Sequence, residues 1–220
     1  MSDETDDTTG GIAGQTANGT TEEDGDGKTI AIGERINLTE LDPTMKEMIA
    51  GLGWQFKGYE GEPLDLDVSI FLLDKNDLTR EDDDFIFYNN TTGCGGAVEH
   101  GGDNRIGAGE GDDETVHFKL SNIPFDIVSI LFVITIYQGD EKGQDFSGVN
   151  SAYLRLFNEQ SSRELVRINI DEAELTGGTA LKIAQLERVG PKWEFQAVGE
   201  LVEGGLKELA EKYGIVVGEY

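Results

Sequence analysis

Apolar and polar residues alternate over much of the chain after residue 28, and this period of two predicts β-strands. The clearest case is PLDLDVSIFLLD (63–74), where the two faces of a strand separate completely at its start. The apolar face holds Leu64, Leu66, Val68, Ile70 and Leu72, and the polar face holds Asp65, Asp67 and Ser69. We therefore expect one face of this strand to lie in a core.

Seven further segments have strand-like patterns. EMIAGLGWQF contains two glycines, which suggests a bend, and DIVSILFVITIYQG is rich in β-branched residues, as in a buried central strand. Two long alternating segments each contain a polar turn and predict hairpins. The segments are TIAIGERINL (29–38, an edge strand), EMIAGLGWQF (47–56), DFIFYNN (84–90), ETVHFKLSNI (114–123), DIVSILFVITIYQG (126–139), and the hairpins 152–170 and 180–200, the second turning at 189–192.

The end of the chain predicts a helix. In LVEGGLKELAEKYG (201–214), Val202, Leu206, Leu209 and Tyr213 fall on one helical face, and Gly214 is placed to end the helix. About eight or nine strands, one terminal helix and no alternation of strands with helices predict an all-β, antiparallel β-sandwich. Trp54 and Trp193 are expected in its core.

The chain divides by composition into two regions. Residues 1–27 hold eight acids and no base, and they contain too few apolar side chains to form a core, so we predict a disordered acidic tail. Residues 28–220 form the predicted domain. Both regions contribute to the formal charge of −27 from 44 acids and 17 bases. A high-salt cytoplasm is one explanation of that acidity, and an acidic partner-binding surface is another.

This charge excludes some partners and favours others. Nucleic acid and anionic lipid need clustered Lys and Arg, so we expect neither direct nucleic-acid binding nor membrane insertion. The longest apolar run, 127–137, is about half of the ~20 residues that a spanning helix needs. The N-terminus shows no secretory signal, which predicts a cytoplasmic protein. Cations and basic partners remain.

Carboxylates gather at two places in the domain. Asp65 and Asp67 lie roughly 7 Å apart on one face of a strand, where they need either solvent or a cation between them. The segment GGDNRIGAGEGDDE (101–114) supplies further oxygen donors among glycines that let backbone carbonyls turn toward one point. Its donors are Asp103, Asn104, Glu110, Asp112, Asp113 and Glu114.

A hard divalent cation suits these donors, because Ca²⁺ takes six to eight oxygen ligands. The segment is not an EF-hand: Arg105, Gly107 and Ala108 stand where that loop requires acids and a glycine. Softer metals are disfavoured, because Cys94 is alone and His100 and His117 lack the spacing that zinc sites use. We expect His117 on the surface and Cys94 as a thiol in a flexible turn.

Five motifs, in order, resemble the TerD family of tellurium-resistance and stress-response proteins: TMKEMIAGLGW, DLDVSIFLLD, DFIFYNN, GGDNRIGAGEGDDE and GGLKELAEKYGI. The resemblance covers about residues 29–217. It implies a β-sandwich that binds Ca²⁺, for which we expect two ions, and no established enzymatic activity. The family pattern falls on Asp65, Asp67, Asp103, Asn104, Glu110, Asp112, Asp113 and Glu114, and its paired asparagines fall on Asn89 and Asn90. Ile106 replaces a frequent Thr.

The leading hypothesis is therefore a Ca²⁺-stabilised scaffold or sensor, with other stress-response or membrane-associated proteins as partners. Two alternatives stay open. One is a metal-dependent hydrolase, although no GxSxG, HExxH or P-loop pattern supplies a base or nucleophile. The other is a small-molecule module, since some proteins of this family have been described as binding cyclic nucleotides. Redox detoxification of tellurite is disfavoured, because only one thiol is present.

Overall fold

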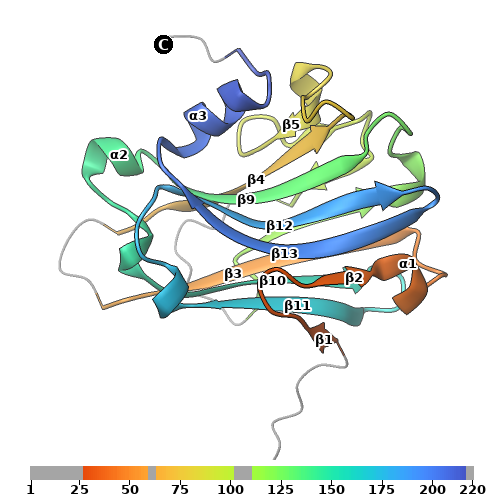
Figure 1. The fold of residues 1–220 in the computed structure, drawn as a ribbon, viewed down its shortest axis with the longest axis horizontal. Helices are drawn as coiled ribbons and strands as arrows, with labels where there is room; N and C mark the ends of the chain where they lie inside the picture. The colour runs from red at the N-terminus through yellow and green to blue at the C-terminus, as the bar shows by residue number, and fades with distance from the viewer. Residues whose placement is uncertain (1–26, 59–62, 102–110, 217–220) are drawn as a thin grey trace, which may run out of the picture.

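Two β-sheets pack face to face, with their strands lying in two layers (Figure 1). This computed structural model describes residues 27–58, 63–101 and 111–216. The seven-stranded sheet has the order β1 (Lys28–Thr29), β11 (Arg163–Asp171), β10 (Val149–Asn158), β3 (Glu47–Phe56), β8 (Glu114–Lys119), β7 (Val98–His100), β6 (Thr92–Gly93). The six-stranded sheet has the order β2 (Arg35–Asn37), β13 (Lys192–Val202), β12 (Ala180–Val189), β9 (Ser129–Ile136), β4 (Leu66–Leu73), β5 (Phe85–Ile86).

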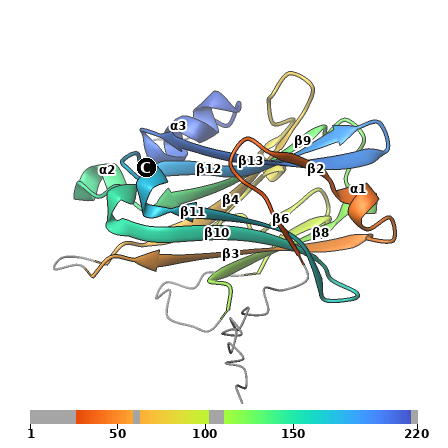
Figure 2. The ribbon, with the colours of Figure 1, turned by 60° about the horizontal axis from the view of Figure 1, so that its bottom comes forward.

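Three helices accompany the sheets. They are α1 (Leu38–Leu41), α2 (Gly139–Lys142) and α3 (Gly205–Lys212), and α3 lies over the outer face of the six-stranded sheet (Figure 2). Short 3₁₀ turns occur at Asp82–Asp84, Leu120–Asn122, Phe146–Gly148 and Glu172–Glu174. In the described ranges no helix has the length and apolar character needed to cross a bilayer.

The predicted β-sandwich with a C-terminal helix is confirmed. Its long strands are those that alternation predicts, and both hairpins form, as β10–β11 and β12–β13. The additional strands have two or three residues each, which is too short for a period-two pattern to show. One pairing departs from the antiparallel expectation, because β1 runs parallel to β11.

The predicted edge strand 29–38 is wrong as a single element. The chain forms β1, turns at Gly33, whose φ is +86°, and then forms β2 at the edge of the other sheet. Glycine permits this left-handed turn without a steric penalty. In the segment 84–90, only Phe85–Ile86 pairs as a strand.

The terminal helix also begins later than predicted. Val202 is the last residue of β13, and α3 begins at Gly205. Leu209 and Tyr213 are buried as expected, and Gly214, with φ +95°, follows the helix where the pattern placed its end. Val202 is therefore not helical. It fits the helical spacing because it packs against the same apolar cluster as Leu209 and Tyr213.

The main core lies between the sheets and includes both tryptophans, as predicted. A second cluster fills the space between α3 and the outer face of the six-stranded sheet, and it contains Phe71 and Leu73 of β4. Strand β4 is therefore buried on both faces. The side of β4 that carries Asp67 and Ser69 is not a solvent face, since these residues are 6% and 0% exposed.

The glycines of β3 have a role other than the predicted bend. Side chains from neighbouring strands lie directly over them on the outer face of the seven-stranded sheet. A Cβ at Gly51 would overlap the carboxylate of Asp112, and a Cβ at Gly53 would overlap the ring of Tyr153. The glycines thus make room for polar side chains that cross the sheet surface.

Replacing Gly51 by alanine should therefore destabilise the protein by about 1–3 kcal/mol, the usual cost of overpacking. Denaturant unfolding of Gly51→Ala measures this loss. Gly58→Ala is the matched control, because a Cβ there meets no atom within 4 Å. Equal stability of the two variants would show that Asp112 does not occupy the space over Gly51.

Candidate metal centre

The described residues include both ends of the glycine-rich segment 101–114 but not its middle. Asp103, Asn104 and Glu110 lie outside the described ranges. On one side the chain is described as far as Gly101, directly after β7, and on the other it resumes at Gly111, three residues before β8 begins. These ends fix where the segment leaves and re-enters the sheet.

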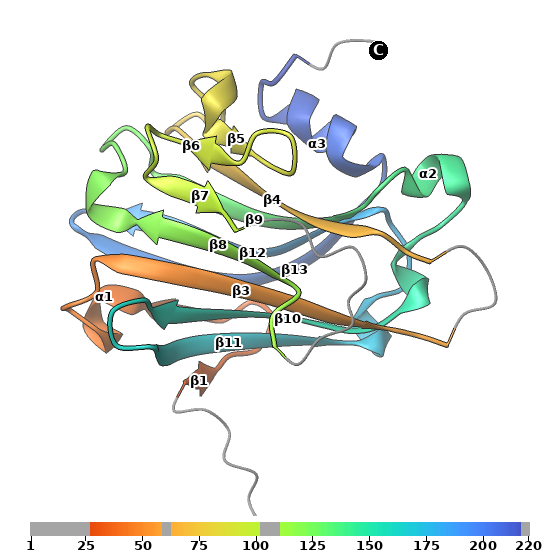
Figure 3. The same cartoon turned by 180° about the vertical axis from the view of Figure 1, so that it is seen from behind.

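Glu114 joins the two sheets at this point. It is the first residue of β8, is 2% exposed, and accepts a hydrogen bond through Oε2 from the backbone N–H of Val68, at 2.7 Å. That N–H lies on the edge of β4 that β5 pairs with, but past the end of β5, which pairs only with Ile70 and Phe71. The view from behind shows β7 and β8 beside β4 (Figure 3). Glutamate here replaces the missing neighbouring strand.

His100, at the other end of the segment, adjoins the same carboxylate. Its Nε2 lies 3.4 Å from Glu114 Oε2, and both side chains are almost fully buried. His100 was not among the expected site residues, because its spacing from other histidines gave no signal. His117, by contrast, is partly exposed and pairs with Glu159, in line with the expected surface position.

Asp65 directly precedes β4, and Asp67 is the second residue of that strand. They alternate with Leu64 and Leu66, which point into the core between the sheets. Asp65 Oδ1 is buried and has no hydrogen-bond partner in the ranges that the structure describes. A buried carboxylate oxygen without a donor is costly and is satisfied by a proton, a water molecule or a cation.

Asp67 shares a cavity with the paired asparagines. Asp67, Asn89 and Asn90 all line it, as the expected grouping of these three residues requires. Asn90 is also held in place, because its side-chain amide donates to the carbonyl of Phe85 at 2.7 Å. The sequence placed these asparagines only through the family resemblance, since loop residues carry no periodic pattern.

Asp112 has a different environment from the other predicted ligands. Arg155 donates to both of its carboxylate oxygens, from Nε at 2.7 Å and Nη2 at 2.9 Å, and the Tyr153 hydroxyl donates at 3.0 Å. The bond to Asp112 raises the pKa of Arg155 above its usual value. This arrangement fixes Asp112 over Gly51 on the outer face of the seven-stranded sheet.

Asp113 extends the pairing between β3 and β8. Its N–H donates to Leu52 at 2.7 Å, and its carboxylate accepts from the N–H of Trp54 at 2.8 Å. Burial raises the pKa of the Asp113 carboxyl, the Trp54 hydrogen bond lowers it, and the charge of Asp112 raises it further. A positive charge near Asp113 would stabilise its ionised form and lower this pKa.

The predicted carboxylate ligands that are described thus fall into three groups. Asp65 and Asp67 belong to β4 and its approach, Glu114 contacts the backbone of β4, and Asp112 and Asp113 contact β3. Within residues 27–58, 63–101 and 111–216, no three His, Cys, Asp or Glu side chains come together closely enough to hold a metal ion. Sequence patterns did not identify Tyr153 and Arg155 as partners of Asp112. Alternation shows on which face of a strand a residue lies, but not which segment lies beside it.

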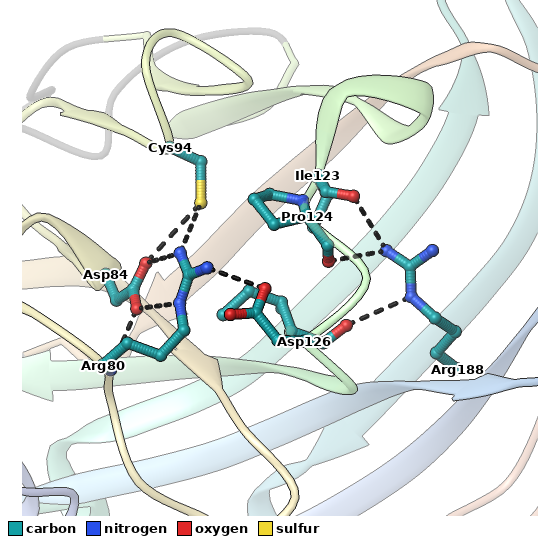
Figure 4. A network of polar contacts seen from close by, with 8 residues as sticks. Arg80, Asp84, Cys94, Ile123, Pro124, Asp126 and Arg188 are labelled. Atoms are coloured by element: carbon teal, nitrogen blue, oxygen red, sulfur yellow. Dashed lines mark hydrogen bonds and ion pairs between the residues drawn. The ribbon is translucent and has the colours of Figure 1, made fainter.

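Cys94 lies in a turn, as expected, and its thiol has polar neighbours there. Figure 4 shows its sulfur beside Asp84 and Arg80, and Sγ is 3.5 Å from Asp84 Oδ1 and from Arg80 Nη2. Asp84 is fully buried and forms a 2.8 Å ion pair with Arg80, which also reaches Asp126. Burial, followed by the negative charge of Asp84, raises the pKa of the Cys94 thiol to about 11.

The Cys94 thiol should therefore react slowly with thiolate-specific reagents. A pKa near 11 instead of 9.0 lowers the thiolate fraction at neutral pH about 100-fold. We expect the alkylation rate of the folded protein to rise about tenfold per pH unit up to pH 10. The same chain in denaturant should level off near pH 9. A plateau near pH 9 in the folded protein would contradict this thiol environment.

Comparison with known proteins supports one family. The TerD domain model matches residues 27–213. Tellurium resistance protein TerD of Serratia marcescens is 40% identical over 187 residues, covering 85% of this chain and 97% of the relative. General stress protein 16U of Bacillus subtilis (strain 168) is 41% identical over 191 residues, covering 86% and 98%.

A solved structure agrees with the fold. The crystal structure of a homologue of telluride resistance protein TerD from Streptomyces coelicolor A3(2) matches with a TM-score of 0.61 at 19% identity. The match covers 78% of this chain and 99% of that one. From the extent of the domain match and the identity to curated relatives, the chain belongs to the TerD family, whose members include tellurium-resistance and general stress proteins.

Proposed function

We propose that this protein binds Ca²⁺ where the segment 101–114 meets the start of β4, and that it acts as a Ca²⁺-stabilised scaffold or sensor in the stress response. The observation that carries the proposal is the buried Oδ1 of Asp65, which has no hydrogen-bond partner in the described part of the chain. A bound cation would give this oxygen the partner that a buried carboxylate needs.

The chemistry of the neighbouring donors fits the same ion. Carboxylate and amide oxygens are hard ligands that Ca²⁺ prefers. Asp65 and Asp67 of β4 would hold the ion together with the donors of the segment 101–114, and Asn89 and Asn90 lie at the same cavity as Asp67. Asp112 suits this role less, because Arg155 already neutralises its charge. We infer that Asp112 instead anchors the segment to the seven-stranded sheet.

The anchoring of both ends of the segment supports a switching role. Glu114 and His100 adjoin each other beside Val68, so the two ends are held next to the proposed ion-binding strand. An ion at this place would neutralise the like charges that the segment and β4 bring together. Such a local change can create or remove a docking surface for a partner protein.

The partners and compartment follow from the family and the charge. We propose that the protein works in the cytoplasm with other stress-response proteins, some of them associated with membranes. The protonated Cys94 thiol favours this binding role over thiol-based reduction of tellurite, because the thiolate is the reactive form. No described contact favours the hydrolase or the cyclic-nucleotide alternative.

Removing one of the paired carboxylates should weaken Ca²⁺ binding. We expect Asp67→Asn to lower the Ca²⁺ affinity at least tenfold in calorimetric titration, because a formal negative charge is lost from the ligand set. In thermal melts, Ca²⁺ should raise the melting temperature of the wild type above its value in EGTA, with a smaller effect from Mg²⁺.

Asp171→Asn is the matched control for this experiment. Asp171 ends β11 and caps a 3₁₀ turn on the other sheet, and asparagine can keep that cap. Its affinity for Ca²⁺ should stay within twofold of the wild type. Equal losses in the two variants, or the absence of Ca²⁺ heat from a folded wild-type sample at millimolar metal, would reject the proposed site.

A further inference from the structure

A cavity of about 760 Å³ lies on the outer face of the six-stranded sheet, beside the part that α3 covers. Its walls come from residues 82–90, from the turn and helix at 137–141, and from the beginning of α3 at 204–210. This volume is within the range of small-molecule sites, which are typically formed where several elements converge. The Ca²⁺ proposal uses Asp67, Asn89 and Asn90 of this lining.

Aromatic rings form one wall. Phe85 and Phe87 stack at 4.4 Å, Tyr88 meets Phe87 edge to face at 5.1 Å, and Tyr88 meets Tyr137 edge to face at 6.0 Å. All four rings line the cavity. The electron-rich face of an aromatic ring attracts cations. Tyr137 already attracts one, since Lys142 Nζ lies 5.2 Å from its ring centre.

The charged residues of the cavity are mainly acidic. Five carboxylates line it, against the single amino group of Lys207; they belong to Asp67, Asp82, Asp83, Asp140 and Glu141. Carboxylates around an aromatic wall concentrate negative potential inside a hollow surface, which raises the local concentration of cations and disfavours anionic ligands. The charge of −27 on the whole chain acts in the same direction.

A polar group next to the wall lacks a partner. The hydroxyl of Thr179 is buried, with the residue 3% exposed, and it has no hydrogen bond within the described ranges. It lies beside Gly205, a lining residue, where an added Cβ would be 3.6 Å from Thr179 Oγ1 and 3.8 Å from Asp140 Oδ2. The absence of a side chain at Gly205 leaves this corner open to a ligand.

We propose that this cavity binds a small organic cation of the quaternary ammonium class, with its charged group against Tyr88 and Tyr137 and near Asp140 and Glu141. A metal ion would use the carboxylates but gain little from the aromatic wall. A quaternary ammonium is weakly hydrated, so it gives up little hydration energy on entering an aromatic site and gains from the ring faces. The proposal does not require Ca²⁺, because the rings and the carboxylates of Asp140 and Glu141 are not among the proposed Ca²⁺ ligands.

Choline and its uncharged isostere 3,3-dimethylbutan-1-ol test the proposal, because they share size and shape and differ in charge. Calorimetric titration of the full chain in EGTA should give choline at least tenfold tighter binding than the alcohol. A separate titration with saturating Ca²⁺ shows whether an ion at Asp67 competes. Equal affinity for choline and the alcohol, or no choline binding at 10 mM in either buffer, would overturn the proposal whatever the outcome for Ca²⁺.

Variants of Tyr137 test the role of the ring. Tyr137→Leu should lower choline affinity at least tenfold, whereas Tyr137→Phe should keep it within threefold, since the ring face remains. Phe125→Leu is the matched control, because Phe125 is 85% exposed and lies over Arg188, away from the cavity lining. If Tyr137→Leu does not fold, Asp140→Asn should weaken choline at least threefold. Unchanged affinity in the folded variants would show that choline binds elsewhere.

Discussion

The hydrogen bond from the Val68 amide to Glu114 joins the two sheets at the place where the chain concentrates its acidic residues. β4 has a strand partner along one edge, but β5 covers the other edge only at Ile70 and Phe71. The carboxylate of Glu114 in β8 accepts the hydrogen bond of the Val68 N–H, which β5 is too short to pair with. The burial of a carboxylate at the junction is costly, and the hydrogen bond from the Val68 amide offsets part of that cost.

The position of the acidic segment follows from this contact. Because Glu114 is fixed against β4, the segment 101–114 must end there, and His100 brings its beginning to the same carboxylate. Asp113 and Asp112, one and two residues earlier, are fixed to Trp54 and Arg155 of the seven-stranded sheet. The folded sheets thus define the ends of the segment. An ion at Asp65 and Asp67 would then act on the residues between those ends.

Strand β4 also connects the proposed Ca²⁺ site with the cavity. Its core-facing residues pack between the sheets, and its other face passes from Asp67 and Ser69 to Phe71 and Leu73 under α3. Phe71 stacks on Phe85 at 4.5 Å, which begins the series of rings that leads to Tyr137. Asp67 therefore lines the cavity from the strand whose Phe71 begins this series of rings.

Sequence patterns predicted the parts of the fold that repeat with a period. The long strands and both hairpins follow from alternation, which reports the face of each residue directly. The buried tryptophans follow from the general preference of large apolar side chains for the core. The strands β1, β2, β5, β6 and β7 are too short for this signal. Strand neighbours are set by long-range pairing. Neither the Arg155–Asp112 pair nor the packing of Asp112 over Gly51 could therefore be predicted.

The candidate site shows the same limit. The residue types of Asp65, Asp67 and the 101–114 segment predicted hard-cation chemistry, and the strand period placed the first two on one face. The sequence could not show that α3 covers that face, because the apolar spacing continues across Glu203 and Gly204, which separate β13 from α3. It also gave no signal for His100 or for the ring series.

The most direct test of the account is an amide-resolved NMR titration of the full chain with Ca²⁺. The account predicts that the amides of Asp67, Val68 and Glu114 shift or exchange together as Ca²⁺ binds, while those of the distant turn at Gln160–Ser162 do not. Shifts confined to other parts of the sandwich, or an unchanged spectrum at millimolar Ca²⁺, would contradict an ion at the junction of the two sheets.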